Sequence, residues 1–117
     1  MSRIRLNASK TATIAAGVAL SDAIPFAEFA GAVVHMPAAW TAASIGFHVS
    51  STLAGTYTPL YDDDGVLVQI DSPAVDQSYT FPDAVFPCKF IKLWSQDGSA
   101  GDTNQVAEAS LLVDLKA

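Results

Sequence analysis

The chain has 117 residues, of which 50% are hydrophobic and only 15% are charged, and its formal net charge is −6. This length corresponds to one domain with a hydrophobic core of its own, and the hydrophobic fraction excludes intrinsic disorder. A small domain with so few charged residues is typical of proteins that bury part of their surface against partners.

The basic residues are unevenly distributed along the chain. Arg3, Arg5 and Lys10 make the N-terminus locally basic, whereas the segment from Thr11 to Cys88 contains eight acidic residues and no Lys or Arg. Nucleic acids and anionic membranes are bound by basic surfaces that neutralise phosphates. We therefore expect neither as a partner.

In chain order, residues 1–9 are expected to form an extended arm that precedes a single domain over residues 10–117. The Ala-rich run 10–20 is interrupted by Thr and Gly, so we interpret it as one or two short strands and not as a signal peptide. No run approaches the ~20 apolar residues of a membrane helix. Segment 21–31 is expected to be a connecting loop that places its aromatic residues inward, and 32–36 a short strand.

The stretch 37–50 is the most informative part of the sequence. Its first half is small and turn-forming around one large aromatic residue, Trp40. Its second half alternates, with Ile45, Phe47 and Val49 on one side and smaller or polar residues on the other. This period of two predicts a strand with one buried face over 44–51, and Trp40 is expected to cap the core beneath it.

The remainder of the chain continues the same pattern of short alternating segments. Turns are expected at 53–56 and 62–65, and Pro59 predicts an edge position for the strand that contains it. Further strands are expected at 57–61, 66–70, 77–81, 89–95 and 109–116. Helix-forming residues leave a helix as the alternative over 106–116. The sequence thus predicts an all-β, antiparallel sandwich of jelly-roll type with about eight or nine strands.

The residues that could carry chemistry are few. His35 and His48 have no Cys or Glu at ligand spacing, so metal binding is not expected there. Asp62, Asp63 and Asp64 could offer carboxylates to calcium, but they lack the spacing of a calcium loop, and a solvated turn is the preferred interpretation. Cys88, the single cysteine, excludes an intramolecular disulfide and is expected to be a buried, unreactive thiol. No catalytic or cofactor motif is present, so we expect no cofactor and no enzymatic activity.

The strand over 89–95 contains the strongest candidate for a contact surface. Phe90, Lys92 and Trp94 share one face of this strand, opposite Ile91 and Leu93. Either this second face is covered by the domain's own loops or N-terminal arm, or an aromatic–basic–aromatic stripe is exposed and available to a protein or a sugar. Together with the basic N-terminus, the candidate partner contacts are Arg3, Arg5, Lys10, Phe90, Lys92 and Trp94.

Several of these segments together resemble a group of small virion structural proteins of tailed bacteriophages, which have a galactose-binding-like jelly-roll sandwich. The resemblance covers most of residues 29–116, and Pro37-Ala38-Ala39-Trp40-Thr41-Ala42-Ala43-Ser44 is its most specific part. The other segments that carry it are 29–31, 45–50, 60–65, 90–95 and Asn104-Gln105.

The resemblance implies a structural or adhesive role on a virus particle. We expect a capsid decoration or cement protein that is made in the host cytoplasm and located on the capsid surface. Its partners would be the major capsid protein or another virion protein, together with further copies of itself, for example in a trimer. A carbohydrate-binding or adhesion module on the head, neck or tail, which would use Phe90, Trp94, Tyr57 or Tyr61, is the alternative.

Overall fold

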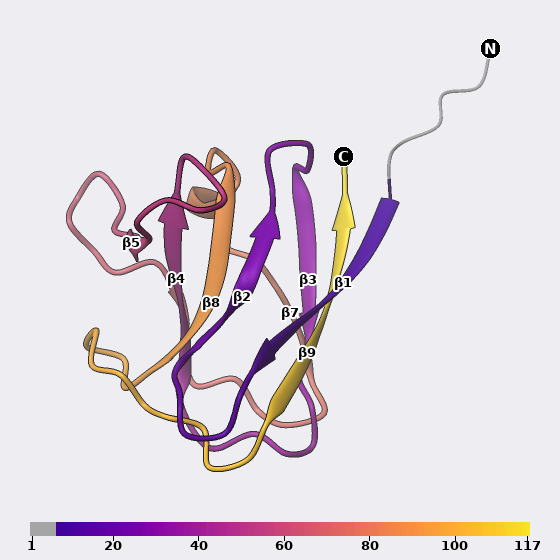
Figure 1. Ribbon diagram of the computed structural model, residues 1–117, viewed down its shortest axis with the longest axis vertical. Coiled ribbons are helices and arrows are strands. Elements are labelled where there is room, and N and C mark those ends of the chain that lie inside the picture. Colours follow the sequence, from indigo (N-terminus) through magenta and orange to yellow (C-terminus); the bar gives the residue numbers. More distant parts are fainter. Residues whose placement is uncertain (1–6) are drawn as a thin grey trace.

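The computed structural model describes residues 7–117, which form a sandwich of two antiparallel β-sheets (Figure 1). The elements are β1 (Asn7–Ile14), β2 (Leu20–Pro25), β3 (Gly31–His35), β4 (Ser44–Ser50), β5 (Thr58–Pro59), β6 (Gln69–Ile70), β7 (Ser78–Thr80), the short 3-10 helix η1 (Asp83–Val85), β8 (Phe90–Gln96) and β9 (Ala109–Lys116). The prediction of a single-domain, all-β antiparallel sandwich is confirmed. Within these residues no helix has the length and hydropathy needed to cross a membrane.

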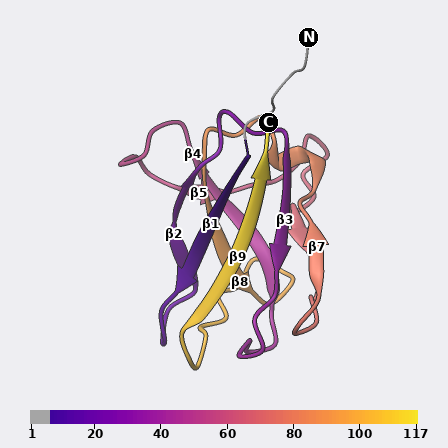
Figure 2. The same ribbon diagram turned by 90° about the vertical axis from the view of Figure 1, so that its right-hand side faces the viewer.

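The two sheets have the strand order of a jelly roll. One sheet has four strands in the order β1-β9-β3-β7, and the other has the order β2-β8-β4-β5, with β6 pairing to β4 as its fifth strand. The chain crosses between the layers at almost every connection, which Figure 2 shows from the side of the four-stranded sheet. Residues at the beginning and end of the described chain are therefore neighbours, since β1 pairs with β9 along its whole length.

The core lies between the inner faces of the two sheets. β9 alternates strictly, because its four inward residues are buried and its four outward residues are exposed. β4 and β8 lie side by side in the opposite layer, where Phe47 and Leu93 are partners in register and both are fully buried. Apolar residues at a period of two thus predict the sandwich, because each strand has one face to bury.

Aromatic rings fill one end of this core. Phe81 stacks on Phe26 with ring centroids 6.0 Å apart and lies 5.3 Å from Phe47 at a tilted angle. Phe86, from the turn after η1, also stacks on Phe26, with ring centroids 5.5 Å apart. The aromatic residues expected to point inward from 21–31 do so, since Phe26 is fully buried and Phe29 packs against the core.

The loop around Trp40 closes the core at the opposite end. Trp40 is only 8% exposed and belongs to the core cluster, which confirms its predicted capping position. The fully buried Gln105 holds this loop in place: its Oε1 accepts the amide of Thr41 at 2.8 Å, and its Nε2 donates to the Thr41 carbonyl at 3.0 Å. The side chain of Gln105 thus pairs with both the backbone N–H and the backbone C=O of Thr41, as a neighbouring strand would.

Several sequence-based boundaries differ from the structure. Segment 21–31 was expected to be a loop, but Leu20–Pro25 is a strand whose register with β8 shifts between Leu20 and Ala23. This irregularity removes the alternation that would have revealed it. The strand expected over 66–70 is reduced to Gln69–Ile70, and Val66 is 59% exposed beside the acidic turn. β1 begins at Asn7, so residues 7–9 belong to the sheet and not to the arm.

Candidate functional site

The stripe on β8 lies on the outer face of the five-stranded sheet, but one of its members is not available to a partner. Trp94, one of the predicted contact residues, is only 2% exposed, so its side chain is not open on this surface. Its indole Nε1–H donates to Asp102 Oδ1 at 2.7 Å. Asp102 lies in the loop after β8 and forms an isolated antiparallel β-bridge with Gln96, the last residue of that strand. The domain's own loop therefore covers this end of the stripe, which was the alternative left open by the sequence.

The indole of Trp94 also depends on the strand beside it. Gly46 on β4 is its partner in register, and a Cβ placed on Gly46 would lie 2.6 Å from Trp94 Cε3. His48, two residues further along β4, packs edge-on against the same indole with ring centroids 4.5 Å apart. The indole of Trp94 can thus pack over β4 because Gly46 has no side chain at this position.

His48 occupies an unusual position on this outer face. Its Nε2 is buried and has no hydrogen-bond partner among residues 7–117. Burial lowers the pKa of His48, and Lys92 acts in the same direction, whereas Asp102 and a hydrogen bond to the backbone of Tyr57 oppose the shift. The imidazole is thereby favoured in its neutral form.

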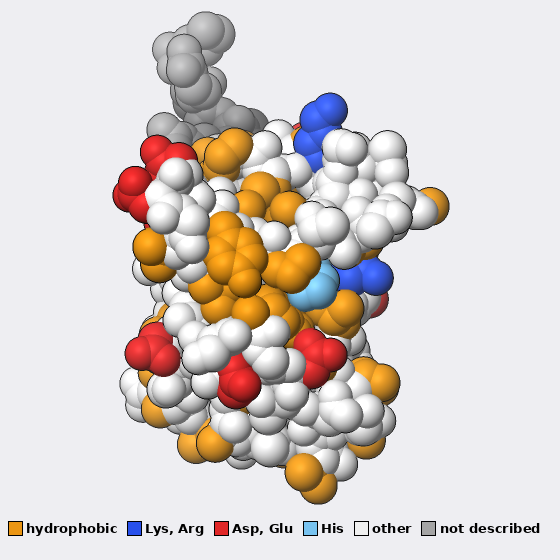
Figure 3. Space-filling model, turned by 90° about the vertical axis from the view of Figure 1, so that its left-hand side faces the viewer, with side chains coloured by type: hydrophobic (Ala, Val, Ile, Leu, Met, Phe, Trp, Pro, Cys, Tyr) orange, Lys and Arg blue, Asp and Glu red, His pale blue; other side chains and the backbone are white. Residues whose placement is uncertain are grey.

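The part of the stripe that remains accessible centres on Lys92. Its Nζ lies 4.5 Å above the centre of the Tyr57 ring, a cation–π contact. The Tyr57 hydroxyl donates to the Leu53 carbonyl at 2.8 Å, which ties this ring to the loop before β5. Phe90 and Lys92 are half-buried, and Tyr61 is 47% exposed. Figure 3 shows this side of the molecule, where hydrophobic side chains gather around one histidine, with acidic groups above and below.

A groove of about 540 Å³ lies at the edge of this surface. Hydroxyl side chains of Ser50, Ser51, Thr52 and their neighbours line one wall, and 87–89 lines the other. Cys88 contributes to this wall, and burial raises the pKa of its thiol, which favours the neutral thiol over the reactive thiolate. The groove can offer hydrogen bonds to a polar ligand or a loop of a partner.

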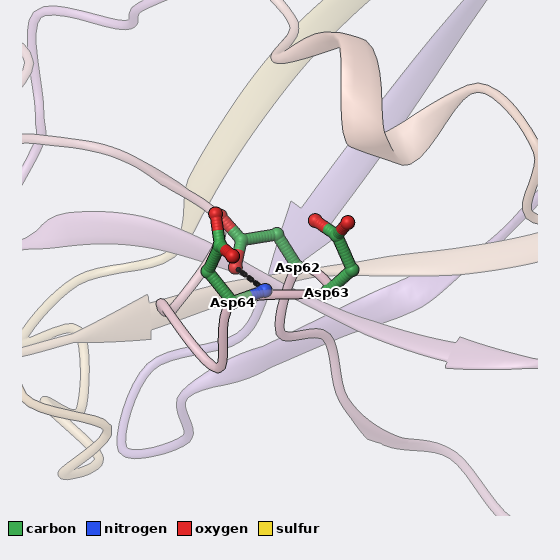
Figure 4. Close-up of side chains that lie close together, drawn as sticks. All are labelled: Asp62, Asp63 and Asp64. Atoms are coloured by element: carbon green, nitrogen blue, oxygen red, sulfur yellow. Dashed lines mark hydrogen bonds between the residues drawn. The ribbon is translucent and has the colours of Figure 1, made fainter.

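The acidic turn at 62–65 adopts the predicted solvated geometry. Asp62 Oδ1 accepts a hydrogen bond from the backbone amide of Asp64 at 2.9 Å (Figure 4). It also accepts one from the backbone amide of Val66 at 2.9 Å. The three carboxylates of Asp62, Asp63 and Asp64 each have an oxygen within 4.8 Å of the others, and they are the one group of this kind in residues 7–117. The turn is accounted for by its own hydrogen bonds, and the carboxylates give this corner a strong negative charge.

A second polar arrangement, which the sequence did not reveal, crosses the outer face of the four-stranded sheet. Ser9 Oγ donates to Asp114 Oδ1 at 2.7 Å, Asp114 Oδ2 lies 2.8 Å from His35 Nε2, and His35 Nδ1 lies 2.7 Å from Ser78 Oγ. One chain of hydrogen bonds thus joins β1, β9, β3 and β7. The bonds from Ser9 and His35 lower the pKa of Asp114.

Ser, His and Asp are also the residue types of a hydrolase triad. Here the serine faces Nδ1 and the carboxylate faces Nε2, which reverses the catalytic arrangement. The His35 and Asp114 side chains are 40% and 51% exposed on an open sheet face. These hydrogen bonds link neighbouring strands of the sheet. That the protein has no enzymatic activity stays a prediction.

The predicted contact residues do not form one surface. Arg3 and Arg5 lie outside the described residues. Lys10 is exposed on β1, in the opposite sheet from Phe90 and Lys92. Lys10 has the same parity as the buried Ala12 and Ile14, so it is an inward-facing charge near the end of an edge strand, a position that opposes pairing with other strands.

Comparisons with known proteins identify the fold. No family model matches the sequence, and no curated protein matches it significantly. Among solved structures, the chain is similar to the crystal structure of the SPBc2 prophage-derived protein YomS, with a TM-score of 0.58 and 10% sequence identity, over 100% of both chains. At this identity the similarity concerns the fold, which is shared from end to end.

Proposed function

We propose that this protein is a non-enzymatic structural protein of a bacteriophage particle that decorates and stabilises the capsid. The observation that carries the proposal is the similarity of fold, over the full length of both chains, to a prophage-derived protein. It agrees with the resemblance of 29–116 to small virion structural proteins of tailed phages. The protein would be made in the host cytoplasm and located on the outside of the virion.

The surface chemistry is suited to such a role. The two sheets bury an extensive core, whereas the exposed side of the five-stranded sheet carries Lys92, Tyr57 and Tyr61 beside a hydroxyl-lined groove. Aromatic and basic side chains of this kind are enriched where proteins contact each other. We assign the contact with the major capsid protein, or another virion protein, to this surface, with Phe90 at its edge.

The proposal is tested by mixing the purified protein with capsids that lack it and sedimenting them. We expect saturable co-sedimentation and a higher temperature of capsid disruption. Tyr61→Ala on the contact surface should weaken binding, whereas Leu112→Ala, which removes a similarly exposed side chain from the opposite sheet, should not. Protein that stays in the supernatant at all ratios would contradict the proposal.

Carbohydrate binding is the second candidate function, and the aromatic residues of the same surface favour it. The exposed ring of Tyr61 is able to stack on a sugar, whereas Trp94 is not, because it is buried. Binding on a glycan array that is lost in Tyr61→Ala would support an adhesion module. Absence of binding to every glycan, together with capsid co-sedimentation, would favour decoration.

A further inference from the structure

A second groove, of about 540 Å³, opens on the outer face of the four-stranded sheet, where β3 begins and β9 ends. Gly31, which pairs with Lys116 on β9, is one of the lining residues. Because it has no side chain, it leaves the groove open at this point. Val33, Phe81 and Phe86 supply apolar walls. Phe86 and Val33 are only half-buried, so part of this apolar surface is open.

The rim of this groove is acidic. Asp83, at the start of η1, and Asp114, on β9, both line it, and Lys116 is the one cation among its lining residues. Residues 7–117 contain all 12 acidic residues and four lysines, so their formal charge is 4 − 12 = −8. The groove therefore favours an occupant that is apolar and positively charged.

The N-terminal segment of this chain has that chemistry. Residues 1–6 contain Arg3 and Arg5 but no acidic residue, which gives them a charge of +2. Ile4 and Leu6 alternate with the arginines, so an extended segment would present apolar side chains to one side and cations to the other. Six extended residues reach about 20 Å, enough to span a groove of this size.

We propose that the groove of one copy receives residues 1–6 of a second copy, so that the protein self-associates by exchange of N-terminal arms. Asn7 pairs with Lys116, and Lys116 pairs with Gly31, so the arm begins at the rim of the groove. Asn7 is itself among the lining residues, and a segment that continued β1 beyond Asn7 in the direction of the strand would leave this copy instead of turning across β9 into its groove. In the groove of a neighbour, Arg3 and Arg5 of this segment would meet Asp83 and Asp114.

Disulfide trapping between two different variants tests this directly. In a Cys88→Ser background, one variant carries Ile4→Cys in the arm and the other carries Val33→Cys in the groove. Mixing the two under mild oxidation should give a disulfide-linked heterodimer on a non-reducing gel. A control pair of Ile4→Cys with Leu112→Cys, exposed on the same sheet but outside the groove lining, should give little product.

The double variant, with both cysteines in one chain, distinguishes the two sources of the arm. A cross-link within one chain, independent of protein concentration, would overturn exchange between copies. The absence of any cross-link in both formats would overturn the groove as the arm's binding site. A concentration-dependent link between chains supports the proposal.

Charge reversal and filling of the groove provide a second measurement that does not rely on cysteine chemistry. Arg3→Glu with Arg5→Glu should weaken self-association in analytical ultracentrifugation at least about tenfold. Lys10→Glu, a single charge reversal outside the arm and the groove, should have little effect. Gly31→Leu should also weaken it, and unchanged self-association in both groove and arm variants would contradict the proposal. None of these readouts requires capsids, so they succeed or fail independently of the proposed function.

Discussion

Gly46 lacks a side chain at the one place where the indole of Trp94 crosses β4. A Cβ there would lie 2.6 Å from Trp94 Cε3 and 3.2 Å from Gln96 Cγ. The ring cannot move without losing its hydrogen bond to Asp102 and its contact with His48. The absence of a side chain at Gly46 thus allows Trp94 to be buried. In the sequence, Gly46 is recognisable only as one of the outward-facing positions of an alternating strand.

Gly46→Ala should therefore destabilise the protein by about 1–3 kcal/mol, the usual cost of inserting a methyl group into a filled space. Gly31→Ala is the matched control, because its Cβ would meet Lys116 at ordinary contact distances of 3.8 and 3.9 Å. Urea unfolding followed by tryptophan fluorescence measures both. Equal stability of the two variants would contradict this role of Gly46.

His48 makes stability depend on pH at this same site. Burial lowers its pKa in the folded state, so the folded protein binds fewer protons than the unfolded chain. The free energy of unfolding should therefore decrease as the pH falls below about 6.5, the pKa of an unfolded histidine. The difference between the wild type and His48→Gln, measured from pH 8 to pH 5, isolates this contribution, and parallel curves for the two proteins would refute it.

At the scale of elements, the sequence predicts strands well where one face is buried and the register is unbroken. β4 and β9 were expected at nearly the residues where they occur, because both alternate over seven or eight positions. β2 was missed because its bulge shifts the apolar residues out of period. Strands of two or three residues such as β6 carry too few positions for a pattern, and tertiary contacts determine where they end.

The candidate site was less predictable than the fold, because a strand pattern identifies faces and not what covers them. The alternation of β8 placed Lys92 and Trp94 on one face correctly. The burial of Trp94 depends on Asp102 and Gly46, which approach it from other segments. The link between His35 and Asp114 requires the register of β3 on β9, which no single-strand pattern contains.

The hydrogen-bonded chain through Asp114 makes the four-stranded sheet sensitive to acid. Its bonds with Ser9 and His35 lower the pKa of Asp114 below that of an unfolded aspartate. The stabilisation is therefore present above about pH 3.9 and is lost as the pH falls through the lower folded-state value. Asp114→Asn should reduce the loss of stability between pH 5 and pH 2.5.

An exposed aspartate in the acidic turn serves as the control for this prediction. Asp63→Asn removes the same charge without a hydrogen-bonded partner of this kind, so acid denaturation should keep the wild-type shape. Thermal unfolding followed by circular dichroism at each pH gives the comparison. An Asp114→Asn curve that matches the Asp63→Asn curve would show that the chain of hydrogen bonds contributes nothing.

At the scale of the whole molecule, the outer faces of the two sheets differ in their charge and in the side chains that they expose. The five-stranded sheet presents Lys92 and the tyrosines, and the four-stranded sheet presents the acid-rimmed groove. We propose the first side as the contact with the capsid and the second as the contact with neighbouring copies, and because the two sides lie on different sheets both contacts could be made at once. A decoration protein that binds its neighbours gains avidity for a repeating lattice without further contacts to it.

The pairing of β1 with β9 also means that the order in which the strands are joined is not essential to the sandwich. Asn7 and Lys116 are direct partners, about 5 Å apart between Cα atoms as in any antiparallel pair, so a short glycine–serine linker can connect them. A circular permutant opened between Leu53 and Ala54, both exposed in the loop between β4 and β5, should fold with a loss of no more than about 2 kcal/mol. A permutant opened between Leu112 and Val113, inside β9, should not fold. The new termini would then emerge beside the surface that we propose for the capsid contact, and the accessibility of peptides fused there would show which side of the protein faces outward.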